Sequence, residues 1–332
     1  VVDRFFNLVL SLTKSRKQQQ VIEDGGARLG SYGYGKMVFA LSSSLRTMIY
    51  YSHFPKDERA GDDNKRLMAT AFLPSYFVEK EEMEYTGQAY FGYESGRENN
   101  PRKPLVNDDA DRFYTELGFN PREPGDYGTS VVLPACDFSI SEIGQAIEKW
   151  WWPLLTLSDL GSKLQIELIE DDGSAYELNP QQRSNLNPFI QAFRNLNENT
   201  NIEKKAKTQD IQINLPTKLV PGKVSCLRLP KNSEIELKNC TAFIRDNLVI
   251  EYWDKAFSEE GVGSVGVFAV SDEVKKAEIK RIITFSEPPA HDRWFEYLDR
   301  LTTVYGNYGS DVVRQTKNQI AFKCKDFQLR LE

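Results

Sequence analysis

The stretch that most constrains this chain runs from residue 28 to residue 37 and reads Arg-Leu-Gly-Ser-Tyr-Gly-Tyr-Gly-Lys-Met. An apolar run at 38–41 and an alternating segment at 46–52 follow it. A glycine-rich loop that leads into a helix can direct several backbone N–H groups at one anion. We therefore interpret the stretch as a phosphate-binding loop. The alternative is a flexible turn before a buried helix, because short glycine motifs often match by chance.

The composition is that of an ordinary globular protein. The chain has 332 residues, of which 40% are hydrophobic and 27% charged, so it is long enough for about two domains. A net charge of -6 gives no overall attraction for nucleic acid. The four cysteines are far apart and only two histidines occur, which favours neither a zinc site nor a disulfide framework. No apolar run approaches the ~20 residues that cross a bilayer, and we expect a cytoplasmic protein without a membrane partner.

Sequence periodicity predicts an α+β fold with two domains, residues 1–138 and 139–332, and a further boundary near 197–209. In the first domain we expect helices at about 3–14 and 37–44, and a third that starts at Asn107 and is capped by its Asn and Asp side chains. Expected strands cover 45–52, 69–77 and 88–93, and another follows Gly128.

In the second domain a capping box at Ser139 predicts a helix that carries three consecutive tryptophans as packing residues. A hairpin turn at 171–174 and a helix at 187–196 follow. We then expect strands at 211–215, 223–229, 241–253, 264–270 and 281–285. A short helix to about residue 304 and a closing strand at 319–331 follow.

Two familiar phosphate loops do not fit. A P-loop needs Ser or Thr after its lysine to bind Mg²⁺, and Met37 stands there. The dinucleotide-binding motif needs a third glycine where Val38 stands, and no apolar strand precedes the loop.

The order of features resembles the C-terminal half of the nucleotide-binding domain of the GHKL superfamily, which contains gyrase, large heat-shock chaperone, histidine-kinase and mismatch-repair ATPases. The shared features are a basic polar loop, the spaced glycines with Lys36, a short helix, a strand, and a later strand that begins with Gly128-Thr129. The resemblance implies a partial Bergerat-type α/β sandwich, with helices on one face of a mixed sheet, followed by a second, transducer-like helix-on-sheet domain. It also implies that an ATP lid ends in this loop, and that the nucleotide is contacted by Gly30, Gly33, Tyr34, Gly35, Lys36 and, on the adenine side, Thr129.

Part of the family pattern does not precede residue 30. The helix with the catalytic Glu and the Mg²⁺-binding Asn is not found, and neither is the Asp-x-Gly-x-Gly adenine motif. We expect this part upstream in the full gene, and a degenerate, non-hydrolysing homologue is the alternative. Accordingly, ATPase activity with Mg²⁺ is expected of the intact protein and not of this chain alone, and ATP could drive homodimerisation.

Three other interpretations stay open. The segment 286–294 resembles one in uncharacterised bacterial ATP-binding proteins, and its His291-Asp292 is either an acid–base pair or a packing element. A non-enzymatic protein-interaction module would bind its partner through the tryptophan-rich helix and an exposed sheet. Nucleic-acid binding is disfavoured by the acidic charge, although basic residues occur at Lys14, Arg16, Lys17, Lys204, Lys205 and Lys207.

Overall fold

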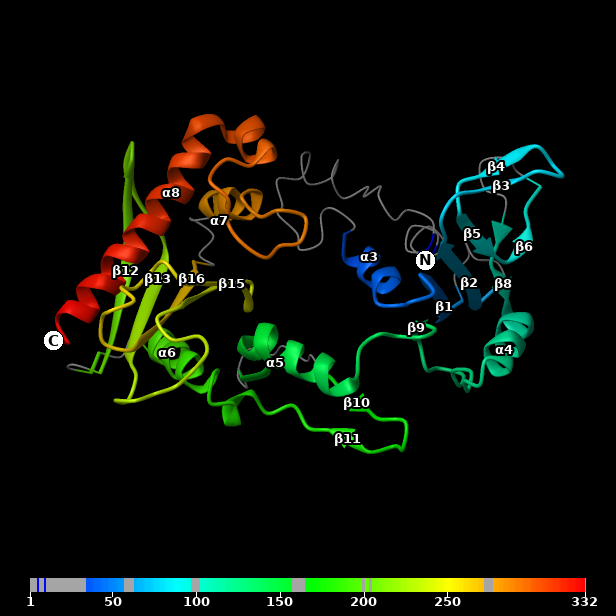
Figure 1. Cartoon of the computed structure of the whole chain (residues 1–332), viewed down its shortest axis with the longest axis horizontal. Helices are drawn as coiled ribbons and strands as arrows, with labels where there is room; N and C mark the ends of the chain where they lie inside the picture. Colours follow the sequence, from blue (N-terminus) through cyan, green and yellow to red (C-terminus); the bar gives the residue numbers. More distant parts are fainter. Residues whose placement is uncertain are drawn as a thin grey trace. The chain divides into compact units, whose positions relative to one another are not determined.

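The computed structural model describes Phe5, Val9 and residues 34–56, 63–96, 102–156, 165–198, 201–202, 205–271 and 277–331. The chain divides into two compact units, Val1–Ser139 (unit 1) and Ile140–Glu332 (unit 2). Both contain helices and sheets, which confirms the predicted α+β class (Figure 1). Among the described residues, no helix combines the length and the apolar character that crossing a membrane requires.

Unit 1 is built on a sheet in the order β5–β2–β1–β9, with β8 also paired to β2. The strands of this sheet are β1 (Thr47–His53), β2 (Lys65–Phe72), β5 (Gln88–Phe91), β8 (Leu105–Val106) and β9 (Gly128–Val132). Two separate two-stranded sheets pair β3 (Tyr76–Val78) with β4 (Met83–Tyr85), and β6 (Tyr93–Glu94) with β7 (Arg102–Lys103). The continuously described helices are α3 (Tyr34–Leu41) and α4 (Asn107–Glu116).

The central strand β1 is buried on both sides of the unit 1 sheet. Met48 and Tyr50 pack with α3, whereas Ile49 and Tyr51 point to the other face and pack with α4. All described pairings in this sheet are antiparallel. The sequence led us to expect a mixed sheet with helices on one face; the two-sided burial of β1 explains why helices cover both.

Unit 2 contains a mixed sheet in the order β12–β13–β16–β14–β15, in which β14 and β16 are parallel. Its strands are β12 (Ala206–Leu215), β13 (Thr217–Arg228), β14 (Thr241–Arg245), β15 (Leu248–Trp253) and β16 (Ser264–Val270). A small hairpin joins β10 (Leu168–Ile169) to β11 (Ala175–Tyr176). The helices are α5 (Ile140–Thr156), the 3₁₀ turn η1 (Pro180–Gln182), α6 (Asn187–Glu198), α7 (Ala277–Phe285) and α8 (Asp299–Leu329).

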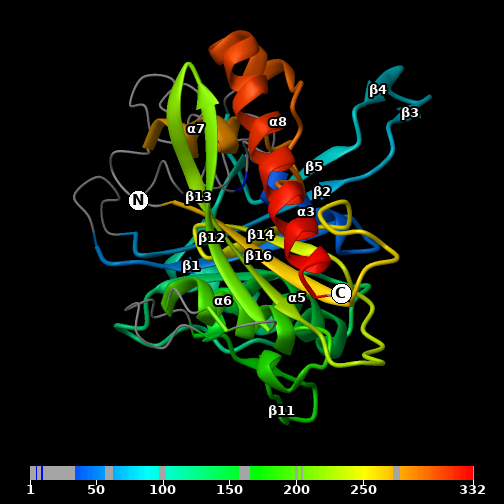
Figure 2. The same cartoon turned by 90° about the vertical axis from the view of Figure 1, so that its left-hand side faces the viewer.

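Helices cover both faces of the unit 2 sheet. On one face, Trp152 of α5 and Phe189 of α6 pack against Val265 and Val267 of β16. On the other face α8 lies along β12 and β13 (Figure 2), and Cys324 of α8 lies 3.7 Å, Sγ to Sγ, from Cys226 of β13. The long helix is broken at Gly306, whose φ of 58° and ψ of -150° are not helical.

Three strand predictions in unit 2 are wrong. The expected strand 241–253 is the hairpin β14–β15, whose turn residues Asp246 and Asn247 both have positive φ, as a type I′ turn requires. The expected strands 281–285 and 319–331 belong to helices α7 and α8. In α8, Ile320 and Cys324 are buried at helical spacing, and that spacing was obscured by the apolar Phe322, which is exposed.

The predicted cap of α4 is also wrong. Val106 occupies the N-cap position and no side chain caps the helix. Instead, the Asn107 side-chain oxygen accepts hydrogen bonds from the backbone N–H groups of Asn64 and Lys65, at 3.1 and 3.4 Å. Asn107 thus ties the start of α4 to the chain that enters β2.

Candidate functional site

The glycine loop leads directly into helix α3. Gly30 and Gly33 lie outside the described residues, and Tyr34, Gly35 and Lys36 form the first turn of α3, where the backbone alone is described. The helix thus starts three residues earlier than the sequence predicted. The N–H groups of a first helical turn have no acceptors within the helix. The three residues after Gly33 therefore carry the donors that a phosphate-binding loop needs.

Thr129 lies in β9, on the sheet face that α3 covers. It is directly opposite Ser52 of β1, and the two hydroxyl oxygens are 2.8 Å apart. Because side chains alternate along a strand, Ser52 points to the same face as Tyr50, which packs with α3. Thr129 is exposed on this face, so its hydroxyl is accessible to a ligand beside the Ser52 hydroxyl.

The other face of the unit 1 sheet has a small polar pocket of about 270 Å³ at the ends of β1 and β2. His53, Lys65 and Asp111 line it. Asp111 accepts hydrogen bonds from Tyr51 Oη at 2.7 Å and from Lys65 Nζ at 2.5 Å, and His53 Nδ1 lies 2.9 Å from the carbonyl oxygen of Asp126. Burial, with the hydrogen bond to Asp111, raises the pKa of Tyr51. These contacts join α4 to the sheet, and sequence reasoning missed them because the partners are far apart in the chain.

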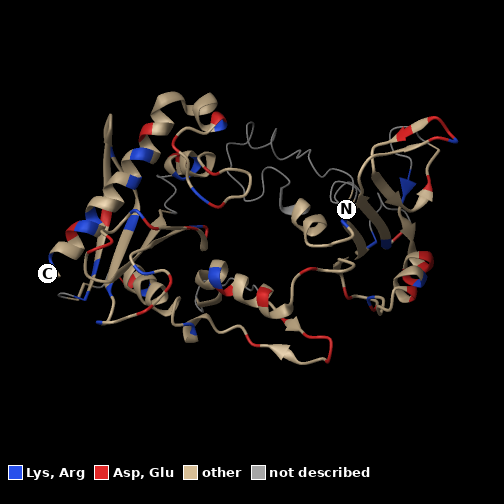
Figure 3. Ribbon diagram, viewed as in Figure 1, with Lys and Arg blue, Asp and Glu red and all other residues tan. Residues whose placement is uncertain are grey.

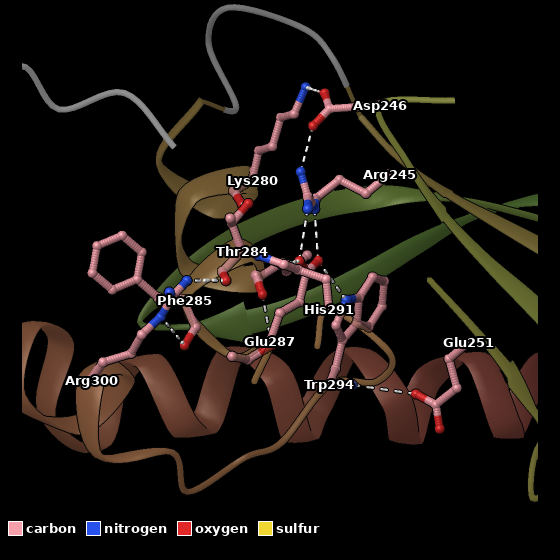
Figure 4. Close-up of polar contacts among 12 residues, drawn as sticks. Arg245, Asp246, Glu251, Lys280, Thr284, Phe285, Glu287, His291, Trp294 and Arg300 are labelled. Carbon is pink, nitrogen blue, oxygen red and sulfur yellow. Dashed lines mark hydrogen bonds and ion pairs between the residues drawn. The ribbon is translucent and has the colours of Figure 1, made fainter. Parts of the chain in front are cut away.

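His291 of unit 2 belongs to a buried network around Glu287 (Figure 4). Its Nδ1 lies 2.6 Å from Oε2 of Glu287, four residues earlier in the sequence. Glu287 also accepts two hydrogen bonds of 2.7 Å from the guanidinium of Arg245, and one of 3.2 Å from the indole N–H of Trp294. Asp292, the other member of the predicted acid–base pair, accepts a hydrogen bond of 3.4 Å from Arg293.

The Glu287 network therefore favours the packing interpretation of His291. Arg245 and Glu287 are completely buried, and their charges compensate each other within the core. Asp246 adds a second carboxylate to Arg245 and also pairs with Lys280. The network holds the segment after α7 against β14.

No metal centre is formed by the side chains that the structure describes, since no three of the His, Cys, Asp and Glu residues among them come together. The tryptophan run is a packing element: Trp152 is fully buried, Trp150 packs on the same core, and Trp151 is partly exposed. The three tryptophans therefore give no further candidate site.

No family model matches this chain, and a search of curated proteins gives no significant match.

Proposed function

We propose that this chain binds ATP through a GHKL-type lid, and that it forms the C-terminal part of the nucleotide-binding domain together with a following α+β domain. The observation that carries the proposal is the position of α3, which begins at the residue after Gly33. A helix N-terminus with glycines just before it lets phosphate oxygens approach the backbone closely.

Each candidate residue has a distinct part in this proposal. The N–H groups of Tyr34, Gly35 and Lys36 donate to the phosphates, and the lysine charge adds a Coulomb attraction. Thr129 offers a hydroxyl to the adenine side. ATP would order the lid by these phosphate contacts, which is an established kind of switch.

Hydrolysis is proposed for the intact protein and not for this chain. Activating water needs a carboxylate base, and the phosphates need Mg²⁺ with a protein ligand. Among the described residues, the His, Cys, Asp and Glu side chains assemble no group of three or more that could hold a metal ion.

The test is a calorimetric titration of the protein with ATP. The double variant Gly33→Ala with Lys36→Ala adds a methyl group to the loop and removes its cation. We expect ATP affinity to fall by at least about tenfold, since charge-assisted hydrogen bonds to phosphate are lost. The matched control Lys80→Ala, an exposed lysine in the β3–β4 turn of the same unit, should bind ATP as the natural chain does.

Unchanged ATP affinity in the double variant would contradict the assignment of this loop as an ATP lid. A separate variant, Thr129→Val, keeps the side-chain shape but removes the hydroxyl. It should weaken ATP and leave inorganic triphosphate unaffected, because only the adenine side contacts Thr129 in the proposal.

A protein-interaction module is the second candidate function, and the β3–β4 hairpin favours it. Tyr76, Phe77 and Met83 are 52%, 61% and 52% exposed, which is unusual for large apolar side chains in so short a segment. The turn between the strands is acidic (Figure 3), with Glu79, Glu81 and Glu82. This candidate predicts no ATP affinity at the loop of residues 30–36, so the comparison of the natural chain with the double variant separates the two functions.

A further inference from the structure

Unit 2 has a cavity of about 650 Å³ beside the end of β13 and the start of α6. This volume lies within the range of small-molecule binding sites. Among the described residues that line it, every charged side chain is a cation, namely Lys205, Arg228 and Lys231. In the described part of the chain none of the three forms an ion pair, whereas the nearby Lys207 pairs with Asp326.

The backbone around the cavity is fixed by the sheet. Arg228, the last residue of β13, donates its backbone N–H to the carbonyl oxygen of Lys205 at 2.8 Å, and Lys205 immediately precedes β12. Leu229 N–H donates to the carbonyl oxygen of Gly263 at 2.8 Å, and Leu229 is buried in the core of unit 2. Backbone hydrogen bonds therefore hold this wall of the cavity in place.

The lining has two chemically different parts. Leu227, Leu229 and Pro230 give an apolar wall beside the cations. On the α6 side the amide group of Gln191 donates to Asn187 Oδ1 at 2.5 Å. An occupant that satisfies both parts carries several negative charges at one end and a ring or other apolar body at the other.

We propose that this cavity binds a small phosphate-bearing molecule of the nucleotide class. The three cations match the negative charge of a diphosphate or triphosphate. The planar guanidinium of Arg228 can bind two oxygens of one phosphate. The ring lies against Leu227 and Pro230. This site belongs to unit 2 and does not depend on the ATP lid proposed for unit 1.

The experiment measures binding of ADP and of inorganic pyrophosphate to the full chain. Both titrations use the Gly33→Ala, Lys36→Ala background, so that the proposed lid does not contribute. The test variant adds Arg228→Gln and Lys231→Gln. The matched control adds Lys218→Gln and Lys223→Gln, which removes the same charge from exposed positions of β13 outside the cavity.

We expect both ligands to bind the background protein, and ADP more tightly than pyrophosphate because the apolar wall contacts its ring. Removing the two cavity cations should weaken both ligands by at least about tenfold, and the control should change the affinity by less than about twofold. Thermal unfolding of each variant, followed by tryptophan fluorescence, verifies that unit 2 remains folded.

Three results would overturn the assignment. One is the absence of binding in the background protein. Another is equal weakening in the test and control variants, which would mean a general charge effect. The third is a single-stranded oligonucleotide that binds more tightly than ADP and whose affinity is lowered by both pairs of substitutions, which would indicate an extended nucleic-acid surface. The two proposals fail separately: unchanged ATP affinity in the Gly33→Ala, Lys36→Ala variant overturns the lid alone, and absence of ADP binding to that same variant overturns the cavity alone.

Discussion

At the scale of single residues, the buried pair of Arg245 and Glu287 has a large energetic consequence. Both side chains are fully buried and share two hydrogen bonds of 2.7 Å. Removing one member leaves the other charge in the core, and that costs about 3–5 kcal/mol of the free energy of unfolding. Replacing both with apolar residues removes the charges together and costs much less.

We therefore predict that Arg245→Met and Glu287→Leu each destabilise unit 2 by about 3–5 kcal/mol, and that the double variant loses less than the sum. Urea unfolding measures all three. Arg112→Met is the control, because its ion pair with Asp109 is exposed and is worth less than about 1 kcal/mol. A double variant whose loss equals the sum of the single losses would show that the pair is not coupled.

Glu287 also predicts an acid-sensitive stability. Burial raises its pKa, but the hydrogen bonds and charges of His291 and Arg245 outweigh burial, and the net pKa lies below the ordinary value of 4.5. A folded pKa below the unfolded one contributes stability above the unfolded pKa. That contribution is lost as the pH falls through the folded pKa.

The free energy of unfolding should therefore decrease below about pH 4.5 more steeply in the natural chain than in Glu287→Gln, which cannot titrate there. Urea midpoints of unit 2, recorded across the acid range, measure both slopes. Parallel slopes for the two proteins would contradict the assigned pKa direction. Only the slopes are compared, so a lower overall stability of the variant does not affect the test.

At the scale of elements, helix α5 contains an internal proline, and a side chain of strand β15 donates the hydrogen bond that the proline cannot. Pro153 has no N–H, so it cannot donate to the carbonyl oxygen of Lys149 one turn earlier. That oxygen instead accepts a hydrogen bond of 2.7 Å from Tyr252 of β15, and the indole N–H of Trp152 donates to the Tyr252 oxygen at 2.9 Å. The carbonyl group that the proline leaves free thus adds a hydrogen bond between α5 and the sheet.

We predict that Tyr252→Phe destabilises unit 2 by about 1–3 kcal/mol, since two buried polar groups lose their partner. In a Pro153→Ala background the alanine N–H can donate to Lys149, so the same substitution should cost about 1 kcal/mol less. Denaturant unfolding of the four proteins completes the cycle. Tyr297→Phe, at a position 70% exposed, is the control and should be neutral. An equal cost in both backgrounds would mean that Pro153 does not determine the role of Tyr252.

At the scale of the whole molecule, each unit has hydrophobic clusters made of its own residues. Phe189 belongs to a cluster drawn only from unit 2, and Met68 to one drawn only from unit 1. All five tryptophans of the chain lie in unit 2. Tryptophan fluorescence therefore reports on unit 2 alone, whereas far-ultraviolet circular dichroism reports on both units.

Met68→Ala should accordingly lower the unfolding midpoint seen by circular dichroism and leave the fluorescence midpoint unchanged. Phe189→Ala should lower the fluorescence midpoint. Each substitution removes a fully buried side chain and costs about 2–5 kcal/mol. If both substitutions shift both signals together, the two units unfold as one cooperative structure.

The sequence by itself determined features that depend on neighbours in the chain. It predicted the α+β class, the helix α6 with its apolar face, and the turn at Gly173, because periodicity and turn chemistry are local. It also located the glycine loop of the candidate site, although α3 begins earlier than expected. The role of that loop in ATP binding remains a prediction.

Only the tertiary structure decided which distant groups meet. Apolar residues at Ile320, Phe322 and Cys324 alternate as they would in a strand. In the structure they belong to helix α8, where Cys324 packs against Cys226. Thr129 meets Ser52 because β9 pairs with β1 in one register. Glu287 finds Arg245 across 42 residues of sequence. Such pairings depend on how strands and helices pack, and no local pattern specifies a partner that lies far along the chain.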